Sequence, residues 1–309
     1  MATLLLTHDA FLHHSVPDGH PERPDRMRAL QDAFAVEAFG RLHREDAPLA
    51  PIDYAGLAHP VDYVGKIAQL APTEGFAGID ADTLMSAGTM EATLRALGGA
   101  TRAVEAVFTG KARNAFLAAR PPGHHAEHDK AMGFCFFNTA AVAANYARKA
   151  HGAERIAIID WDVHHGNGTQ DIFWADKNVL YASTHQMPLY PGTGAQSETG
   201  EHGTVVNAPL HAGDGGEAFR AAMTSVILPR IKQHQPDLII LSAGFDAHHR
   251  DPLASLQLTE QDFGWATRQV MALAEKHCNG RIVSILEGGY DLIGLADSAS
   301  EHVKALMEA

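Results

Sequence analysis

The stretch Arg-Ile-Ala-Ile-Ile-Asp-Trp-Asp-Val-His-His-Gly-Asn-Gly, residues 155–168, joins an apolar run to a dense group of polar side chains. The first part, 155–159, is rich in isoleucine and lacks strict alternation, which is typical of a parallel strand buried on both faces. In open α/β sheets, ligands bind just beyond the carboxyl ends of such strands. The polar residues that follow this strand are therefore the first candidates for a functional site.

The same kind of apolar run recurs along the chain and alternates with helical patterns. We expect further strands at 114–119, 179–183, 204–208, 237–242 and 281–286. We expect one helix at 87–109. A second begins after Asn138, which can cap it, and ends near 151–152, and a third begins at a Thr259–Asp262 capping box and runs to 277. This alternation predicts an α/β fold, with a largely parallel sheet and helices on both faces. With no repeat, linker or low-complexity tract, we expect a single domain spanning residues 1–309.

The composition restricts the partners. Lys and Arg number 24 against 37 Asp and Glu, so the net charge is −13. An acidic surface repels phosphate, and we therefore expect neither nucleic acid nor an anionic membrane as a partner. Two cysteines are too few for a disulfide framework, and the sequence has neither a signal-peptide pattern nor an apolar run of the ~20 residues that span a bilayer. These features predict a cytoplasmic protein.

Four of the expected strands are followed by histidine, carboxylate or phenol side chains. His124 and His125 follow one strand, Asp162 follows the strand quoted above, Asp246 follows a third and Tyr290 a fourth. Because the carboxyl ends of parallel strands meet at one edge of a sheet, we expect these side chains to lie close together.

Asp160, Asp162 and His164 stand two residues apart, and in an extended chain such residues point the same way. Carboxylates and an imidazole gathered on one face disfavour one another unless a cation is bound. Catalytic zinc sites use three ligands of these types and keep an open position for water. Asp162 and His164 supply two ligands, and Asp246 is a natural third.

The tandem histidines follow Pro-Pro-Gly, a stiff stretch that ends a strand. Near an activated water, one imidazole of His124–His125 can transfer protons while the other stabilises charge. Asp160 and Asn167 are candidate partners for their second ring nitrogens. The Tyr290 phenol, after two glycines, can donate a hydrogen bond to an oxyanion. Each feature alone fits an ordinary buried side chain; their combination favours a catalytic site.

At these residues the sequence resembles the histone deacetylase superfamily, particularly its class II-like bacterial histone deacetylase-like amidohydrolases, which are relatives of acetylpolyamine amidohydrolases. Seven segments match in the family's order across nearly the whole chain: 19–24, 120–126, 133–138, 160–168, 190–194, 242–248 and 286–290. The resemblance implies an arginase/deacetylase-like fold with an eight-stranded, mostly parallel sheet. It also implies zinc-dependent deacetylation, with one zinc ion on Asp162, His164 and Asp246.

The resemblance implies a role for each remaining polar residue. His125 would be the general base and acid, and His124 would assist electrostatically. Tyr290 would polarise the scissile carbonyl, while Asp160 would support His124 and Asn167 would support His125.

Further matches concern the substrate channel and a second cation. Gly133, Phe134 and Tyr190 would line a narrow channel for an acyl-lysine stem, and Tyr190 replaces the phenylalanine common there. The family also binds potassium near the zinc, and the matching ligands, partly through backbone carbonyls, are Asp160, Asp162, His164, Ser183 and Thr184. A second, outer potassium site would fall near Phe173 and Val179.

The substrate stays open between acetyl-lysine, another small N-acyl amine and an acetylpolyamine. Polyamine-selective relatives place an acidic gatekeeper near the rim, where this chain has the neutral Leu253. The early loop with Glu74, Asp80 and Asp82 could supply acid instead.

Two rivals differ in class. An arginase-like ureohydrolase with two manganese ions needs further carboxylates, but position 248, two after Asp246, is His. A catalytically weak, zinc-containing binder of acylated ligands would not need the intact histidine pair and Tyr290. Ferrous iron suits the same N/O ligand set as zinc. The sequence also leaves open whether the chain forms a homo-oligomer.

Overall fold

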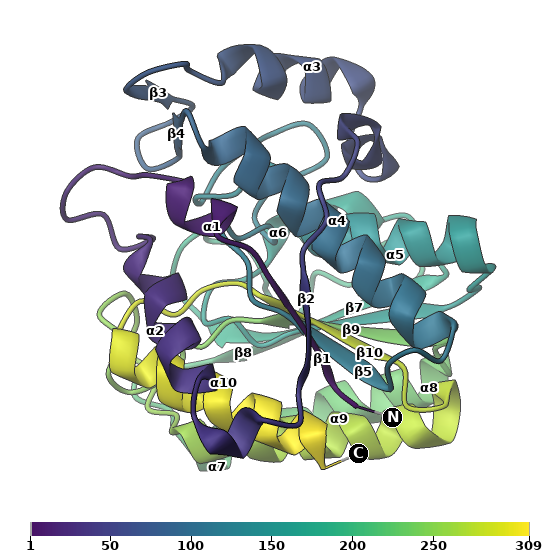
Figure 1. Ribbon diagram of the computed structural model, residues 1–309. Helices are drawn as coiled ribbons and strands as arrows, with labels where there is room; N and C mark the ends of the chain where they lie inside the picture. The colour runs from purple at the N-terminus through teal and green to yellow at the C-terminus, as the bar shows by residue number, and fades with distance from the viewer. Residues whose placement is uncertain (1, 309) are drawn as a thin grey trace.

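Eight strands form one sheet in the computed structural model, which describes residues 2–308. Their order is β2-β1-β5-β10-β9-β6-β7-β8, and each neighbouring pair is parallel (Figure 1). The strands are β1 (Leu4–Thr7), β2 (His43–Asp46), β5 (Asn114–Leu117), β6 (Ile156–Asp160), β7 (Val179–Gln186), β8 (Val205–Leu210), β9 (Leu238–Ala243) and β10 (Ile282–Leu286). A separate antiparallel pair consists of β3 (Phe76–Gly78) and β4 (Leu84–Ser86).

Helices cover both faces of the sheet, which confirms the α/β class and the eight-stranded architecture. In Figure 1, α4 and α5 lie over one face, while α2, α9 and α10 lie over the other. The helices are α1 (Ala10–His13), α2 (Asp25–Phe34), α3 (Val61–Leu70), α4 (Thr89–Phe108), α5 (Thr139–His151), α6 (Asn167–Phe173), α7 (Gly216–Ala222), α8 (Leu228–His234), α9 (Glu260–Cys278) and α10 (Leu292–Met307). Shorter turns of 3-10 helix at Glu37–Phe39 and Ile52–Leu57 and of π helix at Met223–Ile227 complete the set. Within residues 2–308, no helix combines the length and the apolar character that crossing a bilayer requires.

The six strands expected from apolar runs are all present, with ends shifted by a few residues. The apolar pattern does not predict β1 or β2. β1 has only four residues, and β2 reads His-Arg-Glu-Asp and lies at the sheet edge, where three of its four residues are exposed. An edge strand needs no apolar faces, so its composition carries little signal.

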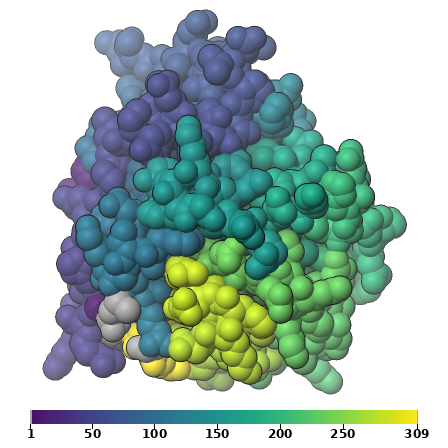
Figure 2. All heavy atoms as spheres, turned by 90° about the vertical axis from the view of Figure 1, so that its right-hand side faces the viewer, coloured from purple at the N-terminus to yellow at the C-terminus, as the bar shows by residue number. Residues whose placement is uncertain are grey.

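The central strands place four loops side by side. β5, β10, β9 and β6 are consecutive in the sheet, and β6, β9 and β10 are buried along their whole length. In register, Asp160 at the end of β6 lies between Ser183 of β7 and Ser242 of β9. Figure 2 shows the early segments (purple and blue) over the top and down the left side of the molecule, and the late segments (green to yellow) at the lower centre and right, with central segments (teal) packed between them. The loops that carry the candidate residues therefore meet at one edge, although they are far apart in sequence.

Candidate metal centre and active site

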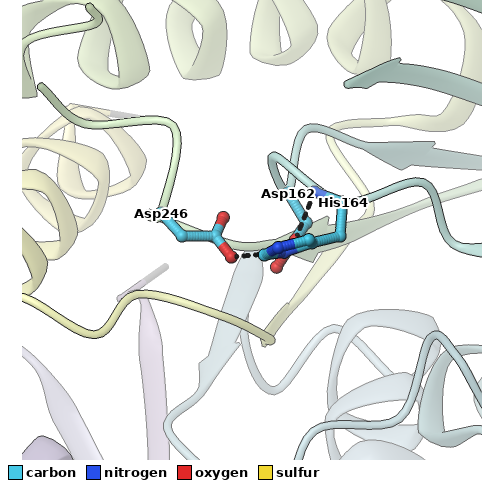
Figure 3. Close-up of side chains that lie close together, drawn as sticks. All are labelled: Asp162, His164 and Asp246. Carbon is cyan, nitrogen blue, oxygen red and sulfur yellow. Dashed lines mark hydrogen bonds and ion pairs between the residues drawn. The ribbon is translucent and has the colours of Figure 1, made fainter. Parts of the chain in front are cut away.

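Asp162, His164 and Asp246 come together just beyond the ends of β6 and β9. All three are buried, and one possible ligand atom from each lies within 4.8 Å of the others. His164 Nδ1 is 3.2 Å from Asp162 Oδ1 and 3.1 Å from Asp246 Oδ2 (Figure 3). One imidazole nitrogen and two carboxylates make a donor set that zinc accepts, with room left for a fourth ligand. The residues present thus fit a metal ion.

Backbone groups and mutual charge define the electrostatics of this triad. Asp162 Oδ2 accepts the Gly288 N–H at 2.8 Å, and Asp246 Oδ1 accepts the Val163 N–H at 2.8 Å. Burial and the charge of Asp162 raise the pKa of Asp246 to about 7. Burial opposes a charge on His164, but the two carboxylates outweigh it and raise the pKa of His164 to about 10. A bound cation would relieve the repulsion between two buried carboxylates.

Two glycines leave space for the carboxylates. A Cβ atom at Gly244 would overlap the Asp162 carboxylate, and one at Gly288 would overlap that of Asp246. Because these contacts involve the predicted ligands, any side chain at either glycine would displace a ligand oxygen.

His124 and His125 lie beside the triad and have different partners, although their ring centroids are only 4.0 Å apart. His124 Nδ1 is 3.0 Å from Asp160 Oδ2, and His125 Nδ1 is 2.8 Å from Asn167 Oδ1. Burial opposes a charge on His124, but the carboxylates of Asp162 and Asp160 raise its pKa to about 10. Burial and the neighbouring charged imidazoles lower the pKa of His125 well below its usual range. The surroundings therefore favour the charged form of His124 and the neutral form of His125.

A cavity of about 260 Å³ opens onto His125 and onto His164 of the metal-ligand triad. Gly133, Phe134, Tyr190 and Leu253, the four predicted channel residues, all line it. The full lining is Asp82, His125, Gly133, Phe134, His164, Leu189, Tyr190, Leu253 and Tyr290. Glu74 and Asp80, the other acidic residues of the early loop, do not line this cavity.

The channel wall next to His125 has an unusual backbone. Gly133 and Phe134 have φ values of +57° and +68°, and a Cβ atom at Gly133 would lie 2.5 Å from the His125 ring. Only glycine allows so close an approach, and a positive φ is uncommon at phenylalanine. The Phe134 ring lies 6.0 Å from that of Tyr290, and the Tyr190 ring lies 5.2 Å from that of His125.

Tyr290 faces the same cavity from the loop after β10. Burial and the negative charge of Asp246 raise the pKa of its phenol well above the usual value. The phenol therefore keeps its proton at neutral pH and can donate a hydrogen bond.

The predicted potassium ligands lie on the adjoining strand ends. Ser183 pairs with Asp160 in register, and its hydroxyl lies 2.8 Å from His185 Nδ1. Among residues 2–308, the Thr184 hydroxyl oxygen is one of the few buried side-chain atoms without a hydrogen-bond partner. Such an atom is compatible with a nearby cation.

Two fully buried charged residues that the sequence does not single out contact the site backbone. Glu287 Oε2 accepts the His124 N–H at 3.1 Å, and Arg26 Nε donates to the Gly289 carbonyl at 2.6 Å. Glu287 follows an apolar strand directly, which is the one sequence signal that could have identified it. Arg26 lies in a helix remote in sequence, and nothing in its spacing indicates the contact.

Asp251 is a third such residue. It is 8% exposed, and its carboxylate accepts the backbone N–H of Tyr290 at 2.7 Å and of Leu253 at 3.0 Å. Its position in a Pro-containing loop is typical of an exposed turn, so the sequence gives no sign of its burial.

Comparison with known proteins agrees with this geometry. The family model of the histone deacetylase domain matches residues 20–306. A probable deacetylase of Archaeoglobus fulgidus is 41% identical over 302 residues, which cover 95% of this chain and 83% of the relative. A histone deacetylase-like amidohydrolase of Pseudomonas aeruginosa is 40% identical over 277 residues, which cover 88% of this chain and 73% of the relative. The crystal structure of the HDA15 HD domain is similar with a TM-score of 0.93 at 36% identity, covering 99% of this chain and 88% of that one.

Proposed function

Because this chain belongs to the histone deacetylase family, we propose that it hydrolyses the amide bond of acetyl-lysine or of a related small N-acyl amine. One observation carries the proposal: His164, a member of the Asp162, His164 and Asp246 triad, lines the same cavity as His125 and Tyr290. Metal ligands, a base and an oxyanion donor are the groups that metal-assisted amide hydrolysis needs.

Zinc held by the triad would act as a Lewis acid on the acyl oxygen and would lower the pKa of a water toward ~7. The lowered pKa of His125 favours its neutral form, which can accept the proton of the attacking water and return it to the leaving amine. Asp162 and Asp160 favour the charged form of His124 against burial, and in that form His124 stabilises the negative charge that develops beside it. Asn167 fixes the tautomer of His125 by accepting at its Nδ1.

Tyr290 completes the site by donating a hydrogen bond to the oxyanion. Replacing Tyr290 by Phe removes this donor while keeping the ring. We therefore expect Y290F to lower kcat on an acetyl-lysine reporter roughly 10²–10³-fold. The measurement is steady-state hydrolysis, with the metal content of both proteins determined by elemental analysis.

The same measurements distinguish the proposed deacetylase from a ureohydrolase and from a zinc-containing binding protein. Full activity of Y290F would exclude the proposed role of the phenol. Two manganese ions per chain would support a ureohydrolase, and one zinc ion without hydrolysis of any acyl amide would support a binding protein. A control variant, Tyr54→Phe, changes a phenol outside the cavity and should leave kcat unchanged.

The cation requirements are part of the proposal. Zinc is the expected metal, although ferrous iron fits the same ligands. Asp160, Ser183 and Thr184 would hold a structural potassium ion, and the unpartnered Thr184 hydroxyl within the described chain supports this.

The neutral Leu253 at the gatekeeper position favours acyl-lysine over acetylpolyamines. Asp82, the one carboxylate that lines the cavity within residues 2–308, is the group that could instead bind the distant ammonium of a polyamine. A panel of acetyl-lysine peptides, acetylputrescine, acetylspermidine and longer acyl-lysines compares these classes by kcat/KM. A preference above about tenfold for acetylpolyamines would reverse this assignment.

A further inference from the structure

The Tyr290 ring packs against Arg26 and Phe134, but the two residues before it in the loop have no side chains. The loop follows β10 as Glu287-Gly-Gly-Tyr290, and Gly289 has a φ of +123°. Gly288 and Gly289 have no side chains that could pack, so their backbone can adopt many conformations. Hydrogen bonds to the loop backbone therefore help to fix the direction in which the phenol points, together with the contacts of its ring.

These hydrogen bonds hold the loop at successive residues. The Gly288 N–H donates to the metal ligand Asp162, and the Gly289 carbonyl accepts from Arg26. The Tyr290 N–H donates to Asp251 Oδ2 at 2.7 Å. The bond to Asp251 is the one made by the backbone of Tyr290 itself, so it acts closest to the phenol.

Asp251 is built into the structure as an acceptor of backbone N–H groups. Oδ2 also lies 3.3 Å from the Asp291 N–H, and Oδ1 accepts the Leu253 N–H at 3.0 Å. A carboxylate that accepts several N–H groups forms charge-assisted bonds, which are shorter and stronger than neutral ones. Since Leu253 lines the cavity, the Asp251 carboxylate connects the channel wall to Tyr290, the proposed oxyanion donor.

We propose that Asp251 is a positioning residue for Tyr290. Its carboxylate fixes the Tyr290 backbone relative to the Leu253 wall of the channel, so that the phenol meets the acyl oxygen. Asp251 acts through Tyr290 and does not itself touch the substrate. This inference rests on the proposed oxyanion role of Tyr290.

A double-mutant cycle between Asp251 and Tyr290 tests the coupling. Asp251→Asn is nearly isosteric, but its amide cannot accept at both ends, so at least one backbone bond is lost. We expect D251N to lower kcat roughly 10- to 100-fold, because small misplacements of a catalytic group have effects of this size. KM should change less than about twofold, and D251N should retain one metal ion per chain. In the Y290F background, D251N should cause no further loss, since the phenol it positions is already absent.

Several outcomes would overturn the inference. An equal loss from D251N in both backgrounds would mean that Asp251 acts independently of Tyr290, while the proposed function would stand. Unchanged kcat for D251N, or loss of the metal from D251N, would also reject the positioning role of Asp251 and leave the proposed function standing. Full activity of Y290F would instead reject the proposed function and this inference with it.

Two further variants complete the design. Asp291→Asn neutralises a carboxylate on the same loop whose side chain bonds Gly294 and Arg250, and it should leave kcat unchanged. If D251N does not fold, Asp251→Glu keeps the charge but moves it by one methylene. D251E should then lower kcat in the wild-type background and have no effect in the Y290F background.

Discussion

At the scale of single residues, the tandem histidines show how environment separates two identical side chains. His124 contacts Asp160 and has a pKa raised to about 10, whereas burial and nearby positive charge hold the pKa of His125 well below its usual range. Groups whose pKa values are driven apart in this way can divide acid–base and electrostatic tasks. Asn167 contributes by accepting from His125 without adding a negative charge.

This argument predicts the effect of Asn167→Asp on the pH profile. A carboxylate in place of the amide would stabilise protonated His125 and raise its pKa. Because the base must be unprotonated, the acidic limb of kcat/KM should move to higher pH. The measurement is kcat/KM against pH for both proteins. As a control, Asn178→Asp adds a carboxylate just before β7, at the end of the strand away from the candidate site, and should not move the acidic limb. A shift of the acidic limb to lower pH in N167D would contradict the prediction.

The site residues divide into those that sequence can reveal and those that it cannot. Asp162, Asp246 and Tyr290 are predictable because each follows an apolar strand closely, and strand ends share one edge. Glu287 and Asp251 contact mainly backbone N–H groups of other segments. A backbone partner leaves no complementary residue type in the sequence, so these contacts emerge only from the fold.

At the scale of elements, strands with clear apolar runs were predictable, including β8 at one edge of the sheet, whereas the short strands β1 and β2 were not. β6, β9 and β10 are buried throughout and mostly apolar because both faces of the sheet are covered by helices, and this leaves a clear pattern. β2 is short and polar because one of its sides is open to solvent. The sequence also carries no signal for β10 lying between β5 and β9, since that order depends on long-range pairing.

The start of α5 offers a prediction at this scale. Asn138 Oδ1 accepts the Ala141 N–H at 2.9 Å, and Nδ2 donates to Thr169 Oγ1 at 3.0 Å. Asn138→Ala removes both, whereas Asn138→Ser retains a hydroxyl that can cap the helix. We expect N138A to lower the free energy of unfolding about 1 kcal/mol more than N138S does. Urea denaturation measures the difference, and equal values would show that the cap contributes nothing.

At the scale of the whole molecule, the two ends of the chain are joined to its centre. β1 lies inside the sheet between β2 and β5, and α10 packs on α2 and α9. The Leu306 carbonyl accepts from Thr3 Oγ1 at 3.1 Å and from Asn114 Nδ2 at 2.9 Å. The first strand, a central strand and the last helix therefore depend on one another.

If the chain is one domain, as its sequence predicts, this connectivity leads us to expect one unfolding transition. Trp161 is buried next to the sheet, Trp174 follows α6 and Trp265 lies in α9, so fluorescence samples separate parts of the chain. We expect urea transitions followed by fluorescence and by far-UV circular dichroism to coincide. A chelator should lower the midpoint of that one transition without splitting it, because a metal bound only to the native state stabilises the whole cooperative unit. Two separated transitions would show instead that part of the sheet unfolds independently of the metal centre.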